Sequence, residues 1–126
     1  MKATDLIIGD WVLINDAPHK IQAIDSIDAE IQADDELYYV GEDRYHSEDS
    51  IEGILITPEI LEKNGWKHSN RLMVIRIDGD DFYWSEGFGG VLYKNQYNMC
   101  DCKYVHNLQH ALRRCWFYEL ADNFKI

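Results

Sequence analysis

Short runs in which hydrophobic and polar residues alternate fill the first half of the chain and predict β-strands. These runs occupy residues 10–15, 19–25, 28–34, 36–41 and 51–57. Polar residues between the runs supply tight turns. Five short strands joined in this way favour a small SH3-like or OB-like β-barrel over residues 1–57, because a sheet of this size gains stability by closing on itself.

A short helix is predicted within residues 57–66, TPEILEKNGW, where several local signals agree. Thr57 is a favourable N-cap, and Pro58 suits the first helical position because its missing N–H needs no partner there. The Asn64-Gly65 pair ends the helix, since glycine readily adopts the left-handed conformation that follows many helix C-termini. This helix joins the barrel to a second lobe over residues 58–126.

The second lobe is predicted to contain a hairpin, a third strand and a C-terminal helix. Residues 71–86 form the hairpin, which turns at DGDD, and residues 91–95 form the third strand. Hydrophobic positions repeat with helical spacing from about Cys102 to Trp116 and give that helix one buried face. Residues 118–126 are predicted to be a short extended end. The fold class is therefore α+β, and the two lobes are expected to form one compact unit.

The composition indicates a globular protein outside the membrane. Hydrophobic residues make up 46% of the 126 positions, which is enough for a core. No run approaches the roughly 20 apolar residues of a membrane span, and the N-terminal segment lacks the apolar region of a signal peptide. A cytoplasmic location is expected, and in that reducing compartment the three cysteines would be free thiols.

Net charge is the strongest compositional feature, because 23 Asp and Glu oppose 12 Lys and Arg and give −11 at pH 7. A surface this negative repels phosphate groups, so direct nucleic-acid binding is not expected. It attracts basic proteins, and exposed aromatic side chains near the acidic stretch 34–49 would make the contacts. The predicted partner-binding residues are Tyr38, Tyr39, Tyr45 and Trp84, with Glu42, Asp43 and Glu48 steering a basic partner.

These features favour a non-enzymatic accessory or adaptor protein that acts by protein–protein recognition and needs no cofactor. The same charge allows an alternative function, in which the protein mimics DNA and inhibits a nucleic-acid-binding protein. Such a mimic would space its carboxylates like phosphates along one face. Nucleophilic catalysis lacks its usual mark, because the sequence contains no strained G-x-S-x-G turn.

A metal-dependent hydrolase is the remaining alternative. On one helix, Cys102, His106 and His110 would lie a turn apart and could offer one sulfur and two nitrogen ligands to zinc. However, one helix face cannot wrap an ion, and the sequence HNLQH lacks the glutamate that metalloproteases place between two histidines. The competing interpretation is a polar helix face that packs against the other lobe or faces solvent.

Three segments, DLIIGDWV, LITPEILEKNGW and YVHNLQHAL, resemble a family of small uncharacterised proteins common in gut Bacteroidetes and their mobile elements. Members share the blocks L-x-x-G-[DN]-x-V, L-T-x-E-x-L-x-K-x-G-[FW] and Y-V-H-x-L-Q, in this order. The matching positions here are Leu6, Gly9, Asp10 and Val12, then Leu55, Thr57, Glu59, Leu61, Lys63, Gly65 and Trp66, then Tyr104, Val105, His106, Leu108 and Gln109.

The resemblance brings no known activity, but it suggests a mobile-element origin. It also implies a structural role for His106 and Gln109 in the last block. Their polar atoms would meet backbone groups of the hairpin and clamp the lobes together. His110 and Cys115 lie outside the shared pattern, which argues against a zinc site common to the family.

Overall fold

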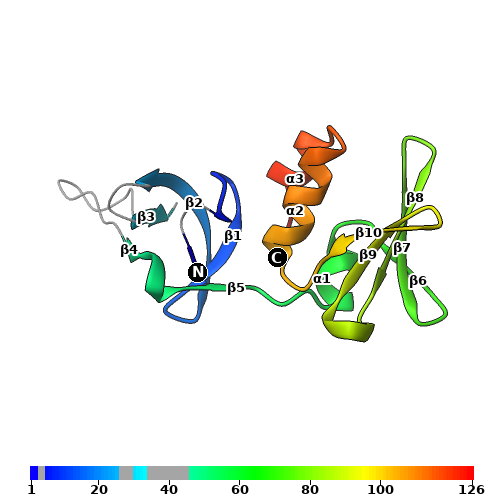
Figure 1. Cartoon of the computed structure of the whole chain (residues 1–126), viewed down its shortest axis with the longest axis horizontal. Coiled ribbons are helices and arrows are strands. Elements are labelled where there is room, and N and C mark those ends of the chain that lie inside the picture. The colour runs from blue at the N-terminus through cyan, green and yellow to red at the C-terminus, as the bar shows by residue number, and fades with distance from the viewer. Residues whose placement is uncertain (3–4, 26–29, 34–45) are drawn as a thin grey trace. The chain divides into compact units, whose positions relative to one another are not determined.

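A computed structural model of the whole chain describes residues 1–2, 5–25, 30–33 and 46–126 (Figure 1). The chain divides into two compact units, unit 1 (Met1–Ile54) and unit 2 (Leu55–Ile126). Each unit contains an antiparallel sheet, and α-helices occur in unit 2. The predicted α+β class is therefore confirmed. No helix in the described residues is long and apolar enough to cross a membrane.

Unit 1 contains a five-stranded antiparallel sheet in the order β4-β3-β2-β1-β5. Its strands are β1 (Trp11–Ile14), β2 (Ala17–Asp25), β3 (Glu30–Ala33), β4 (His46–Ser47) and β5 (Ile51–Gly53). Asn15 and Asp16 both have positive φ, as the two-residue turn between β1 and β2 requires. A bulge between Ile21 and Ala23 bends β2, which pairs with β1 through its first half and with β3 through its second.

Four of the predicted strands correspond to β1, β2, β3 and β5, whereas the strand predicted at residues 36–41 lies outside the described residues. The sequence did not predict β4 or the single-turn 3₁₀ helix η3 (Glu48–Ser50), because two or three residues carry no periodic signal. Among the described residues, no pairing joins β4 to β5, so the sheet is not seen to close into the predicted barrel.

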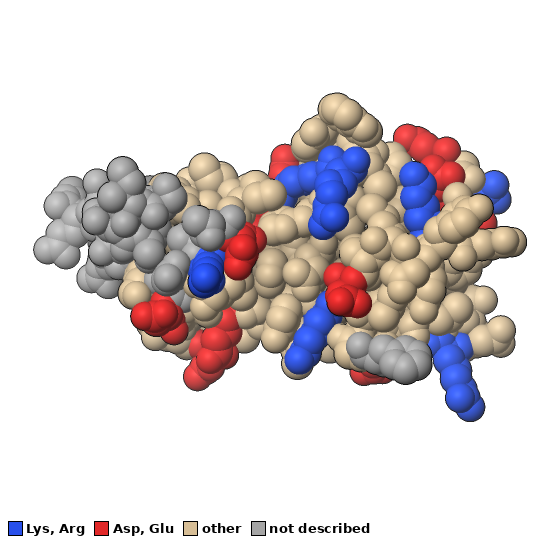
Figure 2. Space-filling model, in the orientation of Figure 1, with Lys and Arg blue, Asp and Glu red and all other residues tan. Residues whose placement is uncertain are grey.

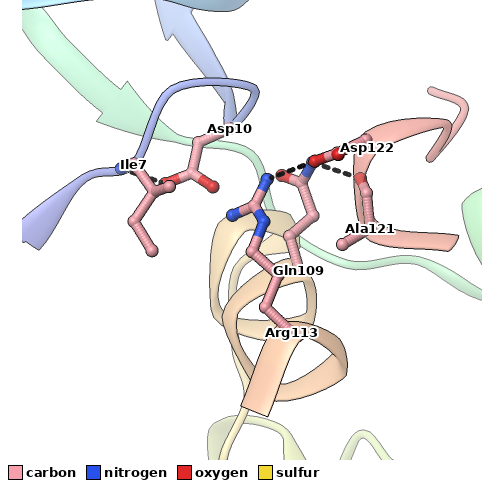
Figure 3. A network of polar contacts seen from close by, with 6 residues as sticks. All are labelled: Ile7, Asp10, Gln109, Arg113, Ala121 and Asp122. Carbon is pink, nitrogen blue, oxygen red and sulfur yellow. Dashed lines mark hydrogen bonds and ion pairs between the residues drawn. The ribbon is translucent and has the colours of Figure 1, made fainter. Parts of the chain in front are cut away.

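A turn at residues 7–10 leads the chain into β1. The backbone N–H of Ile7 donates to Asp10 Oδ2 at 2.8 Å, and Gly9 has a φ of 95° (Figure 3). Asp10 is fully buried, so its carboxylate supports the turn rather than the solubility of the chain. Along β1, every second side chain is buried, so these residues face a common interior. The resulting aliphatic core contains Leu6, Val12, Ile14, Ile21, Ile31 and Ile51.

Unit 2 is built on a five-stranded antiparallel meander in the order β10-β9-β8-β7-β6. Its strands are β6 (Lys67–Ser69), β7 (Leu72–Ile77), β8 (Asp80–Ser85), β9 (Val91–Lys94) and β10 (Tyr97–Asp101). The predicted hairpin is confirmed as β7–β8, and its turn consists of Asp78 and Gly79, both at positive φ. β9 is the predicted third strand. The sequence missed β6 and β10, whose residues are largely polar or exposed.

The helices of unit 2 gather over one face of this sheet (Figure 1). They are α1 (Pro58–Lys63), α2 (Val105–Arg114) and α3 (Tyr118–Asp122). The predicted caps of α1 are confirmed, because Thr57 Oγ1 accepts from the Ile60 N–H at 3.2 Å and Gly65 follows with a φ of 88°. The local sequence thus specifies both ends of α1.

Two predictions about the C-terminal segment are wrong. α2 begins at Val105 rather than Cys102, because Cys102 N–H donates to Gly90 O and Lys103 O accepts from Ile56 N–H, which keeps this stretch extended. The end of the chain forms α3 instead of an extended tail. Its five residues are too few to give a helical periodicity, and side chains of α2 hold it in place.

Aromatic side chains fill much of the core of unit 2. Trp66, Phe82, Trp84 and Phe124 are all less than 5% exposed. Gly90 allows the backbone to pass close by, since a Cβ there would lie 2.5 Å from the Cys102 carbonyl oxygen. The GFGG segment forms the 3₁₀ helix η4 (Gly87–Gly89) followed by the buried Gly90, which leads into β9.

Candidate functional site

Most of the predicted partner-binding residues cannot be placed. Tyr38, Tyr39, Glu42, Asp43 and Tyr45 lie outside the described residues. The backbone of Glu48 begins the 3₁₀ helix η3. The predicted acidic contact surface in unit 1 therefore stays a prediction.

The placement of Trp84 in a contact surface is wrong. Its side chain is only 3% exposed, and its indole Nε1–H donates to the carbonyl oxygen of Cys102 at 2.8 Å. In β8, Phe82 and Trp84 face the core while Tyr83 between them is half-buried. The sequence FYWS gave no clue to this orientation, because three adjacent aromatic residues fit either phase of the alternation.

The three weak metal candidates do not share a helix face. Cys102 lies in the extended segment before α2 and is fully buried, whereas His106 and His110 belong to the helix. Burial raises the pKa of the Cys102 thiol, and the neighbouring Cys100 raises it further, so the thiol is held in its protonated form. Among the described residues, no group of three His, Cys, Asp or Glu side chains could hold a metal ion.

The polar residues of α2 contribute to packing. His106 is 6% exposed and stacks on Tyr104, with ring centroids 5.6 Å apart and an interplanar angle of 10°. It also contacts His110 edge-on at 5.7 Å. Gln109 is fully buried, and its side-chain amide donates to the Ala121 carbonyl at 2.9 Å, in α3 (Figure 3). Gln109 thus meets a backbone group, as predicted for the clamp, but this group lies in α3 rather than in the hairpin.

An exposed aromatic site lies where α2 ends, and the sequence analysis missed it. Trp116 is 78% exposed and Tyr118 is 50% exposed. Their rings meet edge to face, with centroids 6.1 Å apart and an interplanar angle of 76°. We refer to these two residues as the aromatic corner. Its sequence signal is the run Trp116-Phe117-Tyr118 directly after a helix, of which only Phe117 turns inward, against Phe82.

Trp116 occupies an unusual backbone position. Its φ is 70°, its N–H donates to Arg113 O at 3.0 Å, and the next N–H, of Phe117, donates to Leu112 O at 2.9 Å. This is the Schellman arrangement, in which the left-handed residue is usually glycine because other residues suffer a steric penalty there. A bulky aromatic residue in this conformation is rare and strained.

Two arginines precede the aromatic corner. Arg113 Nη2 lies 3.3 Å from Asp122 Oδ1, which ties α2 to α3, and the Arg113 side chain is only 10% exposed (Figure 3). Arg114 is exposed. Exposed Trp, Tyr and Arg are the residue types that most often contribute strongly to protein–protein contacts.

Charge is divided unequally between the two units. Unit 1 contains fourteen Asp and Glu against three Lys and Arg, whereas unit 2 contains nine of each. On the face in Figure 2, both signs are interspersed over unit 2. The net negative charge of the protein therefore resides in unit 1, and the aromatic corner lies on unit 2, whose charges balance.

No protein-family model matches the chain, and neither do the characterised proteins or the solved structures with which it was compared. Function must therefore be inferred from the geometry and charge of the chain itself.

Proposed function

We propose that the protein is a non-enzymatic accessory or adaptor protein that recognises another protein through the aromatic corner. The observation that carries this proposal is the exposure of Trp116, 78%, at a positive φ of 70°. Glycine would be more stable in this backbone conformation. Backbone strain of this kind persists mainly at binding and active sites, where function compensates for it.

The corner has the physical properties of a contact site. Burying one Trp side chain against a partner removes a large apolar area from water, and its rigid ring loses little conformational entropy on binding. Tyr118 supports the indole edge-on, which orients both rings before a partner arrives. Binding energy would concentrate on these two residues, as it does on the few central residues of most interfaces.

Unit 1 would complement this local contact at longer range. Its net charge of −11 attracts basic surfaces and accelerates their encounter with the protein. We further propose that unit 1 is an SH3-like barrel. The strand order β4-β3-β2-β1-β5 and the 3₁₀ turn between β4 and β5 support this fold. The expected partner is therefore a protein with a basic surface and an apolar pocket for Trp116.

The test compares Trp116→Gly with Tyr97→Ala in capture experiments on native-host extract. Tyr97 is a matched control because it is equally exposed, at 78%, and lies in a different part of unit 2. The Gly variant should lose its partner although its fold is more stable, while Tyr97→Ala should retain the same partner. If both variants capture the same proteins as the natural chain, the aromatic corner is not the recognition site.

The charge distribution favours a second candidate function, a DNA mimic that inhibits a nucleic-acid-binding protein. All of the net negative charge resides in unit 1, as such a mimic would require. Binding by this mechanism would weaken steeply with salt and would be unaffected by Trp116→Gly. In the adaptor mechanism, salt slows association but changes the dissociation rate little, because the contact at Trp116 is apolar. Trp116→Gly should then greatly increase the dissociation rate.

A further inference from the structure

A cavity of about 220 Å³ opens within unit 2, between α1, β7, α2, α3 and the end of the chain. Most of its wall is apolar, and the apolar residues are Trp66, Ile75, Ile77, Leu112, Leu120 and Phe124. An apolar cavity of about 150 Å³ is large enough for a benzene molecule. This cavity can therefore hold one aromatic ring with a short chain.

A fixed polar rim borders the cavity. The Asn64 side chain donates from Nδ2 to Lys125 O at 2.8 Å and accepts at Oδ1 from the Lys125 N–H at 2.8 Å. Its Nδ2 also donates to Ile60 O at 2.8 Å, in α1. The backbone of Lys125 is thus held at the end of α1, next to Lys63. Two lysines from distant parts of the sequence therefore border one opening.

The charged residues that line the cavity are both lysines. Of the ten residues that line the cavity, two are lysines, two are asparagines and none is acidic. An apolar interior bordered by two lysines suits an organic anion whose apolar body enters first.

We propose that the cavity is a binding site for a small organic carboxylate that carries an aromatic ring or a short aliphatic chain. The ring would pack against Trp66, Ile75 and Leu112, and the carboxylate would lie between Lys63 and Lys125. Because the Asn64–Lys125 pair holds the rim in place, little ordering is required on binding. This site lies apart from the aromatic corner, and the proposal does not depend on the proposed function.

The experiment uses the full chain, labelled for NMR, and three probes: 3-phenylpropionate, its neutral amide, and acetate. We expect 3-phenylpropionate to shift the Trp66 indole and Ile75 methyl signals in a saturable manner, with a dissociation constant of roughly 1 mM for a ligand of this size. The amide should bind about fivefold more weakly, because exposed ion pairs contribute modestly. Acetate, which lacks an apolar body, should leave both signals unchanged.

Three variants distinguish the parts of the site. Combining Lys63→Gln with Lys125→Gln should reduce carboxylate binding to the level of the amide, whereas Lys67→Gln, at an exposed lysine in β6, should not. Leu120→Trp should fill the cavity and abolish binding of both ring compounds. Leu120 is 42% exposed, so this change should leave the fold intact.

Several results would overturn the proposal. Shifts that do not saturate, or that persist in Leu120→Trp, would show that the ring does not enter the cavity. Equal binding of the carboxylate and the amide would remove the role of the lysines. Equal shifts with acetate would reduce the site to a surface ion contact.

Discussion

Unit 1 and unit 2 both contain a five-stranded antiparallel sheet, but they differ in core and in charge. The core of unit 1 is aliphatic, and the unit carries a net charge of −11. Unit 2 is neutral overall and packs four large aromatic residues in its interior. In the function that we propose, this difference divides the roles: unit 1 provides long-range electrostatic attraction, and unit 2 provides the contacts of the aromatic corner.

The aromatic core of unit 2 should be the more sensitive to single substitutions. Trp84→Ala removes a buried ring and its hydrogen bond to Cys102 O, so we expect a loss of about 3–5 kcal/mol in the free energy of unfolding. Ile21→Ala, in the aliphatic core of unit 1, should cost about 2–3 kcal/mol, because it deletes fewer buried atoms and breaks no side-chain hydrogen bond. Denaturant unfolding measures both. Equal losses would contradict the proposed difference between the cores.

In the same region of unit 2, the backbone at Gly90 lies very close to the backbone of Cys102. In Gly90→Ala the new Cβ would meet the Cys102 carbonyl oxygen at 2.5 Å, and φ is 106°, so we expect a loss of about 2–3 kcal/mol. Gly89→Ala is the matched control. Its φ is 83° but no atom lies within 4 Å, so it should cost only about 1 kcal/mol. Similar melting temperatures for the two variants would contradict the packing argument.

Alkaline pH should weaken unit 2 through Cys102. Because burial raises the pKa of this thiol in the folded protein, the thiolate forms more readily in the unfolded chain. Its stabilising contribution is complete below the ordinary cysteine pKa of about 8.5 and declines above it, by up to about 1.4 kcal/mol per pH unit.

The decline should become shallower in Cys102→Ala, and the remainder comes from Cys100, whose pKa burial also raises. Unfolding curves recorded from about pH 8 to 10 compare the slopes of the two proteins. If the free energy of unfolding falls equally steeply with pH in both proteins, the folded state does not hold Cys102 protonated.

The smallest expected effect is a difference between the two units in how salt changes their stability. Raising the salt concentration from about 50 mM to 500 mM should stabilise unit 1 by a few tenths of a kcal/mol, because it screens the repulsion among its carboxylates. Unit 2, with balanced charges, should change less. Amide hydrogen exchange in β1 and β2, compared with β7 and β8, measures the two responses. Equal changes in protection would refute the electrostatic difference.

The aromatic corner illustrates what sequence reasoning missed. The sequence drew attention to Trp84 and to tyrosines near the acidic stretch, yet Trp84 is buried and Trp116 is exposed. Both tryptophans lie beside other aromatic residues, and local hydrophobicity does not separate them. Their exposure depends on the strand alternation at β8 and on the left-handed turn after α2, which are set by packing.

The three blocks that carry the family resemblance contain many positions that support the fold. Gly9 and Asp10 form the turn before β1, Thr57 caps α1, and Gly65 follows it at positive φ. Gln109 holds α3. Trp116 lies outside all three blocks, so the positions that predict the resemblance do not include the recognition site that we propose.

The sequence by itself determined α1 with its caps, the β7–β8 hairpin and the excess of negative charge, because each depends on a few neighbouring residues or on composition alone. Only the tertiary structure decided that His106 and Gln109 are buried, that α3 is a helix, and that Lys63 and Lys125 border one cavity. These features require contacts between residues far apart in the chain. Burial is a property of packed elements, and local periodicity cannot specify which elements pack together.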